Sequence, residues 1–312
     1  MNSLESYLFT QIECPACSCP DFRVIQRSVY GEQVSEAQIR ELYSAASDHV
    51  LRDQLVRCDQ CGLVYVNPRI EARVLVDSYV NAADPRFVSQ NPERIATFKR
   101  VLQGVCCRFQ IKPSLECRIL DVGCAAGAFP KAASELGFSV VGVEPSAWLA
   151  EYGRREYDVD IRQGVLEPGI FPPTSFEIVS MWDVIEHLPN PNGILLTIRD
   201  LLHDEGLLII NYPDVGSLAS RLLGKRWPFW LSVHLTYYTR KTIVRQLQRA
   251  GFDVLEMRPH WQALKLSYVL LRASQYLSLF SALRKFADTI GIGKHPIVYN
   301  MGQTLVVARK RR

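Results

Sequence analysis

Long apolar runs are missing from this 312-residue sequence. No window of 18 residues is both mainly apolar and free of charge, which excludes an ordinary membrane-spanning helix. The first residues, Met1-Asn-Ser-Leu-Glu, lack the basic stretch and apolar segment of an export signal, so we expect a cytoplasmic protein. Internal repeats and low-complexity tracts are missing too. With 48% hydrophobic and 22% charged residues, the composition predicts a globular chain.

The excess of positive over negative charge is also small. The formal net charge is only +4, and the excess lies in the tail Arg309-Lys-Arg-Arg312, which we expect to end a strand in solvent. A nucleic-acid partner would call for a basic face or stripe. The sequence therefore predicts a small-molecule partner and no nucleic acid, and it leaves the oligomeric state open.

Cysteine is not scarce, and four of the nine cysteines form two C-x-x-C pairs, Cys14/Cys17 and Cys58/Cys61. Each pair can turn two thiolates toward one point, and two pairs complete a tetrahedral sulfur shell, which predicts zinc. Four protein ligands leave no open position, so this zinc would be structural. The alternatives are chance thiols or a redox pair, although neither pair sits at a strand-to-helix junction. Cys19 is a less suitable ligand, and the long gap between the pairs predicts an inserted helix over 35–46.

The stretch from Arg118 to Phe129 organises the rest of the chain. An apolar run closes on Asp121 and continues into a small-residue loop and a helical pattern, which predicts strand, turn and helix. A second apolar run ends on Glu144, about 20 residues beyond Gly123, the spacing at which a carboxylate reaches the ribose of a nucleoside over the glycine turn. The loop from Gly123 to Gly127 has Ala125 where a dinucleotide site has its second glycine, which counts against NAD.

Strands and helices alternate from residue 118 onward, which predicts an α/β domain with a parallel sheet. Strands are expected over 138–144, 159–161, 176–181, 206–211, 252–257 and 303–308, with Ser146 as an N-cap. Residues 70–115 are mainly helical and are expected to fold over the ligand cleft, and Cys106, Cys107 and Cys117 read as small buried residues. The expected domains are 1–75, zinc-binding; 76–115, a helical lid; and 116–312, catalytic.

These motifs resemble those of class I S-adenosylmethionine-dependent methyltransferases. Their first motif, D-x-G-x-G-x-G, is matched by Asp121, Gly123 and Gly127 with Ala125 departing, and the block from Trp182 through Asp183 to His187 is similar to their strand-four motif. The resemblance implies a Rossmann-like, seven-stranded sheet whose last strand is antiparallel. It also implies S-adenosylmethionine as cofactor, held by these residues: Asp121, Gly123, Cys124, Gly127, Glu144, Pro145, Leu166, Trp182 and Asp183.

The cysteine pairs, with the run G-L-V-Y-x-N-P-R after Cys61, resemble the zinc-binding region that precedes the methyltransferase domain in a group of bacterial enzymes. That group includes sugar C-methyltransferases and proteins of polysaccharide biosynthesis. The resemblance favours a sugar or lipid-linked glycan precursor as the acceptor, with a quinone or other aromatic as the enzyme alternative. A methyltransferase-fold protein that only binds partners through its zinc knuckle is the non-enzymatic alternative.

The acceptor end is less determined by sequence. An aromatic connection between residues 212 and 238 should cover the substrate, because loops beyond the carboxyl ends of strands carry ligand sites. In it, His234 is the candidate general base, since imidazole titrates near neutrality, with His187 as the second candidate; a purely structural role is the alternative for both. Residues 264–286 predict a basic amphipathic helix, either a membrane-surface contact or a lid or dimer helix.

Overall fold

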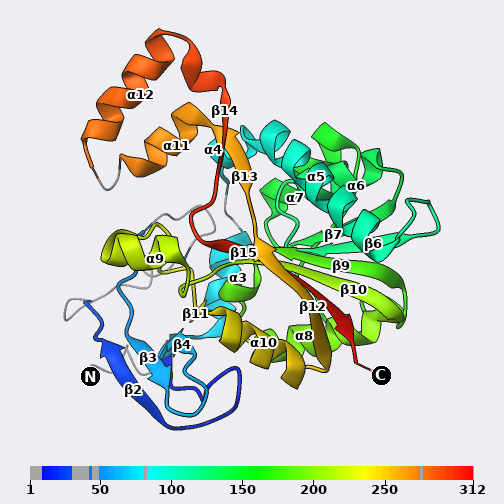
Figure 1. The fold of residues 1–312 in the computed structure, drawn as a ribbon. Helices are drawn as coiled ribbons and strands as arrows, with labels where there is room; N and C mark the ends of the chain where they lie inside the picture. Colours follow the sequence, from blue (N-terminus) through cyan, green and yellow to red (C-terminus); the bar gives the residue numbers. More distant parts are fainter. Residues whose placement is uncertain (1–8, 30–41, 44–48, 81–82, 275–276, 312) are drawn as a thin grey trace.

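A seven-stranded sheet forms the centre of the computed structural model, which describes residues 9–29, 42–43, 49–80, 83–274 and 277–311 (Figure 1). The strand order is β12-β15-β10-β9-β6-β7-β8. The last strand, β15, is antiparallel to both β10 and β12, while the neighbouring pairs from β10 to β8 are parallel. This confirms the predicted fold class. The strands are β6 (Arg118–Val122), β7 (Ser139–Glu144), β8 (Asp160–Gln163), β9 (Phe176–Trp182), β10 (Leu202–Pro213), β12 (Phe252–Pro259) and β15 (Gln303–Lys310).

Both faces of this sheet are covered, which is why its strands read as nearly continuous apolar runs. Ile119 and Ile209 pack with α5 and α6 on one face, whereas their neighbours Leu120 and Leu208 pack with α8 and α10 on the other. Ser146 caps α7 by accepting a hydrogen bond from the Leu149 amide at 3.2 Å, as predicted. The helices are α5 (Asn91–Phe109), α6 (Ala128–Glu135), α7 (Ala147–Tyr157), α8 (Pro191–Leu201) and α10 (Arg240–Arg249).

The N-terminal region forms a smaller sheet that shares its core with the larger one. Its order is β11-β4-β3-β2, and the edge strand β11 comes from the covering loop, so that Thr236 lies opposite Tyr65. Its core residues, among them Val56 and Tyr65, pack in the same cluster as Tyr238 and Ile243. The strands are β2 (Phe22–Gln26), β3 (Leu55–Cys58), β4 (Val64–Val66) and β11 (Thr236–Tyr237). The helix expected over 35–46 lies largely outside the described residues.

The described residues between 72 and 109 are mainly helical, as expected, in α3 (Ala72–Val80), α4 (Pro85–Val88) and α5. Pro85 and Pro92 stand in the first turns of α4 and α5, where a missing amide proton costs nothing. Cys106 and Cys117 are buried, but Cys107 is exposed, so the interpretation of Cys107 as a buried residue is wrong. It lies on the outer face of an amphipathic helix, one position along from the buried Cys106.

The predicted single helix over 264–286 is wrong, because the chain makes a small arm there instead (Figure 1). The arm contains β13 (Gln262–Lys265), α11 (Leu266–Ala273), α12 (Leu279–Thr289) and β14 (Pro296–Tyr299), with β13 and β14 paired antiparallel. Helix α11 ends where the Ser274 hydroxyl donates back to the Leu271 carbonyl at 2.7 Å, which closes its last turn. None of the described helices is long and apolar enough to cross a membrane.

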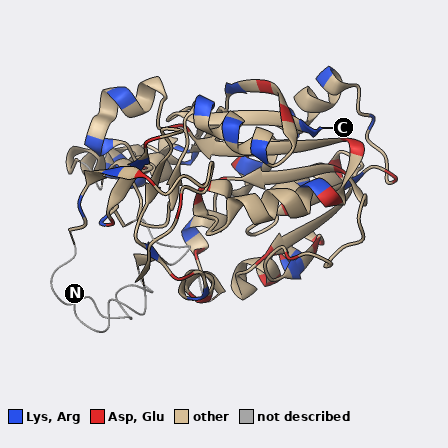
Figure 2. Cartoon of the chain, turned by 90° about the horizontal axis from the view of Figure 1, so that it is seen from below, with Lys and Arg blue, Asp and Glu red and all other residues tan. Residues whose placement is uncertain are grey.

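Positively and negatively charged residues are interspersed along the chain in the view of Figure 2. The basic tail is tied into this pattern: Arg309, Lys310 and Arg311 pair with Glu205, Asp204 and Asp253. Strand β15 runs to Lys310, so the tail ends a strand, as expected.

Candidate functional site

A cavity of about 380 Å³ lies at the carboxyl ends of β6, β7 and β9. Six of the predicted cofactor residues line it: Gly123, Glu144, Pro145, Leu166, Trp182 and Asp183. Helices α3, α4 and α5 contribute side chains from one side, and the loop before β11 contributes others. The segment predicted as a lid and the loop before β11 therefore both line one cavity.

The glycine turn lines the cavity with residues at positive φ, a backbone conformation that residues other than glycine seldom adopt. Gly123 has φ +68°, and a Cβ there would lie 2.7 Å from Val184 Cγ2. Gly127 has φ +75° and packs against Val159 and Ile161. Ala125, where related motifs have glycine, takes φ +47° and accepts the strain of a left-handed residue, about 1 kcal/mol.

Glu144 is held in place by the turn that it faces. One carboxylate oxygen accepts from the Ala125 amide and the other from the Ser146 amide, both at 2.8 Å. Burial raises the pKa of Glu144 to about 7, against the opposing effect of these two bonds. Each oxygen keeps a lone pair, so the carboxylate can still accept from a ligand hydroxyl.

Three predicted cofactor residues lie beneath the cavity and do not line it. Asp121 is buried and accepts from the Ser180 hydroxyl at 2.7 Å, and burial raises its pKa. The Cys124 thiol fills the space over Gly142, where a Cβ would lie 2.4 Å from its Sγ. With Gly127, these residues support the turn from beneath the cavity.

At the β9 end of the cavity, Asp183 stands beside a cation that the sequence analysis missed. Asp183 Oδ1 accepts from Asn211 Nδ2 at 2.7 Å. Burial raises the Asp183 pKa to about 6, and the positive charge of Arg94 opposes the rise. Arg94 stacks its guanidinium 3.6 Å from the centre of the Phe87 ring. Trp182 packs against Phe98, Phe129 and His260.

The opposite end brings the two predicted histidines together. The rings of His187 and His234 lie 4.7 Å apart, edge to face. His187 Nδ1 lies 2.7 Å from the Tyr79 hydroxyl and 3.0 Å from the Val233 carbonyl, and His234 Nδ1 lies 2.8 Å from the Phe229 carbonyl. Burial lowers the pKa of His187 to about 4 and that of His234 well below 6.5, so both rings are neutral at pH 7.

Tyr79 and Glu186 belong to this group, although the sequence analysis did not assign them to the site. Both line the cavity with the histidines. Tyr79 meets His187 across 108 residues of sequence, and no spacing rule links positions so far apart. Glu186 could have been found, because it stands directly before His187 in the strand-four block.

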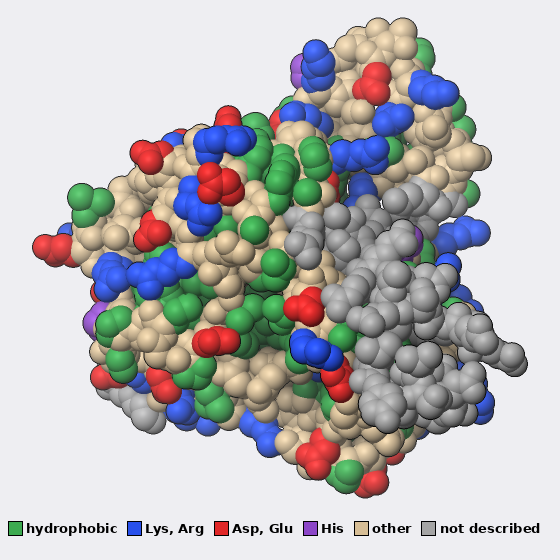
Figure 3. Space-filling view, turned by 180° about the vertical axis from the view of Figure 1, so that it is seen from behind, with side chains coloured by type: hydrophobic (Ala, Val, Ile, Leu, Met, Phe, Trp, Pro, Cys, Tyr) green, Lys and Arg blue, Asp and Glu red, His purple; other side chains and the backbone are tan. Residues whose placement is uncertain are grey.

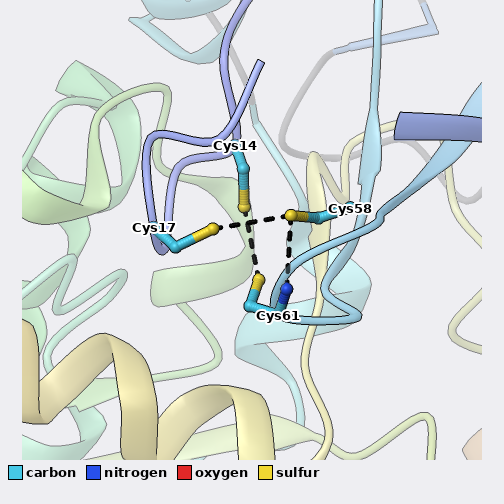
Figure 4. A group of neighbouring side chains, drawn as sticks. All are labelled: Cys14, Cys17, Cys58 and Cys61. Atoms are coloured by element: carbon cyan, nitrogen blue, oxygen red, sulfur yellow. Dashed lines mark hydrogen bonds between the residues drawn. The ribbon is translucent and has the colours of Figure 1, made fainter. Parts of the chain in front are cut away.

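The four paired cysteines also converge, in the N-terminal region (Figure 4). Their sulfur atoms lie within 4.8 Å of one another, with Cys14 to Cys61 and Cys17 to Cys58 at 3.5 Å. Tetrahedral zinc with bonds of about 2.3 Å requires sulfur atoms about 3.8 Å apart, so the group fits that ion. Cys19 lies outside it, with its thiol on the Asp21 carbonyl.

Comparison with known proteins gives a family match over residues 80–257, to a model described as a methyltransferase domain. The chain is 26% identical over 182 residues to the ubiquinone biosynthesis O-methyltransferase of Azorhizobium caulinodans, covering 54% of this chain and 72% of that protein. It is 30% identical over 130 residues to that of Rhodopseudomonas palustris, covering 38% of this chain and 50% of that protein. It is 26% identical over 125 residues to the mitochondrial enzyme of Schizosaccharomyces pombe, covering 38% of this chain and 44% of that protein.

The chain thus spans about half the length of the last two curated relatives. Among solved structures, an S-adenosylmethionine-dependent methyltransferase of Thermotoga maritima matches with a TM-score of 0.46 and 18% identity. That match covers 71% of this chain and 89% of the other.

Proposed function

This chain belongs to the methyltransferase-domain family, and from that premise we propose that it moves a methyl group from S-adenosylmethionine to an oxygen of a small aromatic, quinone-like acceptor. The curated relatives support an aromatic acceptor over the sugar that the sequence analysis favoured, because they are named as ubiquinone O-methyltransferases.

The character of the cavity near the two histidines carries this proposal. Its walls there are mainly apolar: Leu188, Ile194, Phe229 and Leu231. A sugar would bring several hydroxyls, each of which needs a partner when it loses water. A flat aromatic ring buries apolar surface against these walls and needs polar partners only at its reacting oxygen and its neighbours.

The proposed reaction is a direct displacement. The acceptor oxygen forms a bond to the methyl carbon while the sulfur–methyl bond breaks. The electron pair of the broken bond stays on sulfur, which becomes a neutral thioether. The acceptor hydroxyl loses a proton, which reaches solvent. Holding the two groups close and in line supplies much of the acceleration, and we assign control of the proton to the pair His187 and His234.

We assign the cofactor to the other end of the cavity. Glu144 would accept from the ribose hydroxyls, Gly123 would let the backbone approach the methionine part, and Leu166 with Pro145 would form an apolar wall for adenine. Trp182 and Asp183 would flank the sulfonium group, whose positive charge suits an aromatic face and a carboxylate. The backbone turn, supported by Asp121, Cys124 and Gly127, would hold these groups in position.

We propose that the cysteine cluster binds one structural zinc ion and that the domains are 1–75, 76–115 and 116–312. The closed set of four thiols supports a structural role over a catalytic one. The zinc-binding region would also position the loop that carries His234, since β11 in that loop pairs with β4.

We also propose that the arm touches an anionic membrane surface, as a lipophilic acceptor would require. An apolar stripe runs along α12 at helical spacing and is exposed, with Leu279 at 64% and Phe286 at 62%. Lys and Arg side chains are gathered on the arm in Figure 3. Tyr268 and Arg272 of α11 line the cavity, so this contact would bring the cavity close to the lipid.

Methyl transfer from labelled S-adenosylmethionine tests the proposed acceptor. Small catechols and hydroxyquinones should become labelled on oxygen, and a matched panel of nucleotide sugars should not. His187→Gln and His234→Gln should lower the rate at saturating acceptor about 100-fold while cofactor affinity survives. Labelling of the nucleotide sugars alone would return the assignment to a sugar acceptor.

A further inference from the structure

Three potential metal ligands meet at the acceptor end of the cavity. Glu186, His187 and His234 each place a ligand atom within 4.8 Å of the others. Glu186 and His187 come from the short helix η1 (Ile185–His187) directly after β9, and His234 comes from the loop before β11. The Leu235 amide donates to the Glu186 carbonyl at 2.8 Å, so the two segments are fastened together without any ligand.

Both imidazole rings are oriented as metal ligands usually are. A ligating histidine commonly donates its other ring N–H to a backbone carbonyl, which fixes the tautomer and the ring. His234 Nδ1 is 2.8 Å from the Phe229 carbonyl, and His187 Nδ1 is 3.0 Å from the Val233 carbonyl. In the tautomer that donates from Nδ1 to these carbonyls, with the Tyr79 hydroxyl 2.7 Å from His187 Nδ1 as a second acceptor, Nε2 of each ring is the nitrogen left to ligate.

The burial of Glu186 points to a cation independently of the two histidines. Its side chain is 1% exposed, and neither carboxylate oxygen has a hydrogen-bond partner among the residues that the structure describes. The other carboxylates of the cavity are supported: Glu144 accepts two backbone amides and Asp183 accepts from Asn211. A buried carboxylate without partners is costly unless a cation joins it.

We propose that Glu186, His187 and His234 bind one divalent transition-metal cation whose remaining coordination positions face the cavity. Two imidazoles with one carboxylate suit zinc, manganese or iron(II), and such sites keep open positions for a substrate. Magnesium is disfavoured because it prefers oxygen ligands. This ion is separate from the one assigned to the cysteine cluster, which lies in the N-terminal region.

The inference rests on the proposed function and deepens it. A bound cation accepts the acceptor hydroxyl as a ligand and lowers its pKa, so the oxygen loses its proton to solvent before or during methyl transfer. The histidines then control the proton through the ion and not as free bases. An acceptor with two neighbouring hydroxyls could occupy two open positions, which would select catechols over isolated phenols.

Calorimetric titration with MnCl₂ tests the site directly when the full chain carries one equivalent of zinc, which fills the cysteine cluster and leaves the second site open. Manganese binds thiolates poorly, so it should leave the cysteine cluster alone. We expect one manganese ion per chain, with an affinity at least tenfold lower in Glu186→Gln and in His234→Gln. The control His260→Gln removes another buried histidine near Trp182 and should keep the wild-type affinity.

Unfolding midpoints and S-adenosylmethionine affinity establish that each variant is folded. If neither ligand variant folds, the zinc content of the wild-type chain is the test. Two bound zinc ions per chain support the site, and a single ion overturns it. Absence of manganese binding, or equal binding by Glu186→Gln, would also overturn it.

Methyl transfer to catechol with and without EDTA separates this inference from the function. If the rate of methyl transfer is unchanged after the second ion is removed, the proposed role of that ion is refuted, while the methyltransferase assignment stands. Specific manganese binding without labelling of any phenol refutes the acceptor class and leaves the ion site intact.

Discussion

The carboxylate of Glu144 should make cofactor binding depend on pH. Burial raises its pKa in the cofactor-free protein to about 7, compared with 4.5 for a free carboxyl. Ribose hydroxyls donate hydrogen bonds, so they bind the ionised form better. The cofactor should therefore bind more tightly as the pH rises from 5.5 to 7.5, and the affinity should level off above that range. Below pH 7 the change can approach tenfold per pH unit.

Glu144 also makes the stability of the fold depend on pH, but stability falls with rising pH whereas cofactor affinity rises. A folded-state pKa above the unfolded value means that the fold prefers the protonated carboxyl. This contribution, about 3 kcal/mol, is fully present below pH 4.5 and is lost as the pH rises through 7. Saturating S-adenosylmethionine should reduce this loss, because it uses the ionised form.

Glu144→Gln keeps the shape and removes the titration. Its amide nitrogen must face the amide of Ala125 or Ser146, so one backbone bond becomes a contact between two donors. We expect cofactor binding to weaken by about 2 to 3 kcal/mol, which is roughly 30- to 150-fold in Kd. Calorimetry at pH 5.5, 6.5 and 7.5 measures both effects. Asp183 also titrates near pH 6, so only the part of the slope that disappears in Glu144→Gln belongs to Glu144. A pH slope that is equal in both proteins, or a Kd that differs by less than threefold, would refute the reasoning.

Four further predictions concern other parts of the molecule. Cys58→Ser should lose one equivalent of zinc by elemental analysis, whereas Cys19→Ser should retain it, because only Cys58 belongs to the four-sulfur cluster; equal zinc in both would remove the site. Gly123→Ala should abolish cofactor binding and lower the free energy of unfolding by about 2 kcal/mol through its φ of +68° and its contact with Val184. Ala125→Gly should raise that free energy by up to about 1 kcal/mol in urea titrations, and a loss of stability would show that Ala125 is not strained. The double variant Leu283→Asp/Phe286→Asp should lose at least tenfold in binding to anionic vesicles, because each apolar side chain is worth about 1.5 to 3 kcal/mol when buried; Leu115→Asp, at a 78% exposed site outside the arm, should bind like the wild type.

Most strands of the large sheet could be predicted because they carry apolar runs bounded by turns, and the resemblance implied that the last strand is antiparallel. The N-cap at Ser146 and the glycine turn at Gly123 are local features, and local sequence fixes them. The convergence of Cys14 and Cys61 could also be predicted, since metal-ligand spacing encodes contacts between distant segments.

Other parts of the site depend on contacts that no local pattern carries. Arg94 reads as one basic residue on an amphipathic helix, and only the packing of α5 over the sheet places it beside Asp183. Tyr79 meets His187 only because helix α3 packs beside the cavity that both residues line. The arm was misread as one helix because the apolar and basic pattern of α11 and α12 continues through Ser274, although the helix ends there.

The pairing of β11 with β4 has a consequence for how the protein is made. Strand β4 (Val64–Val66) leaves the ribosome early, whereas its outer partner β11 (Thr236–Tyr237) follows only after most of the large sheet has been synthesised. Until then β4 presents an unpaired edge, which is a template for association with other chains. The small sheet cannot be completed during early synthesis, so cutting the chain between its two regions should yield an N-terminal fragment that aggregates.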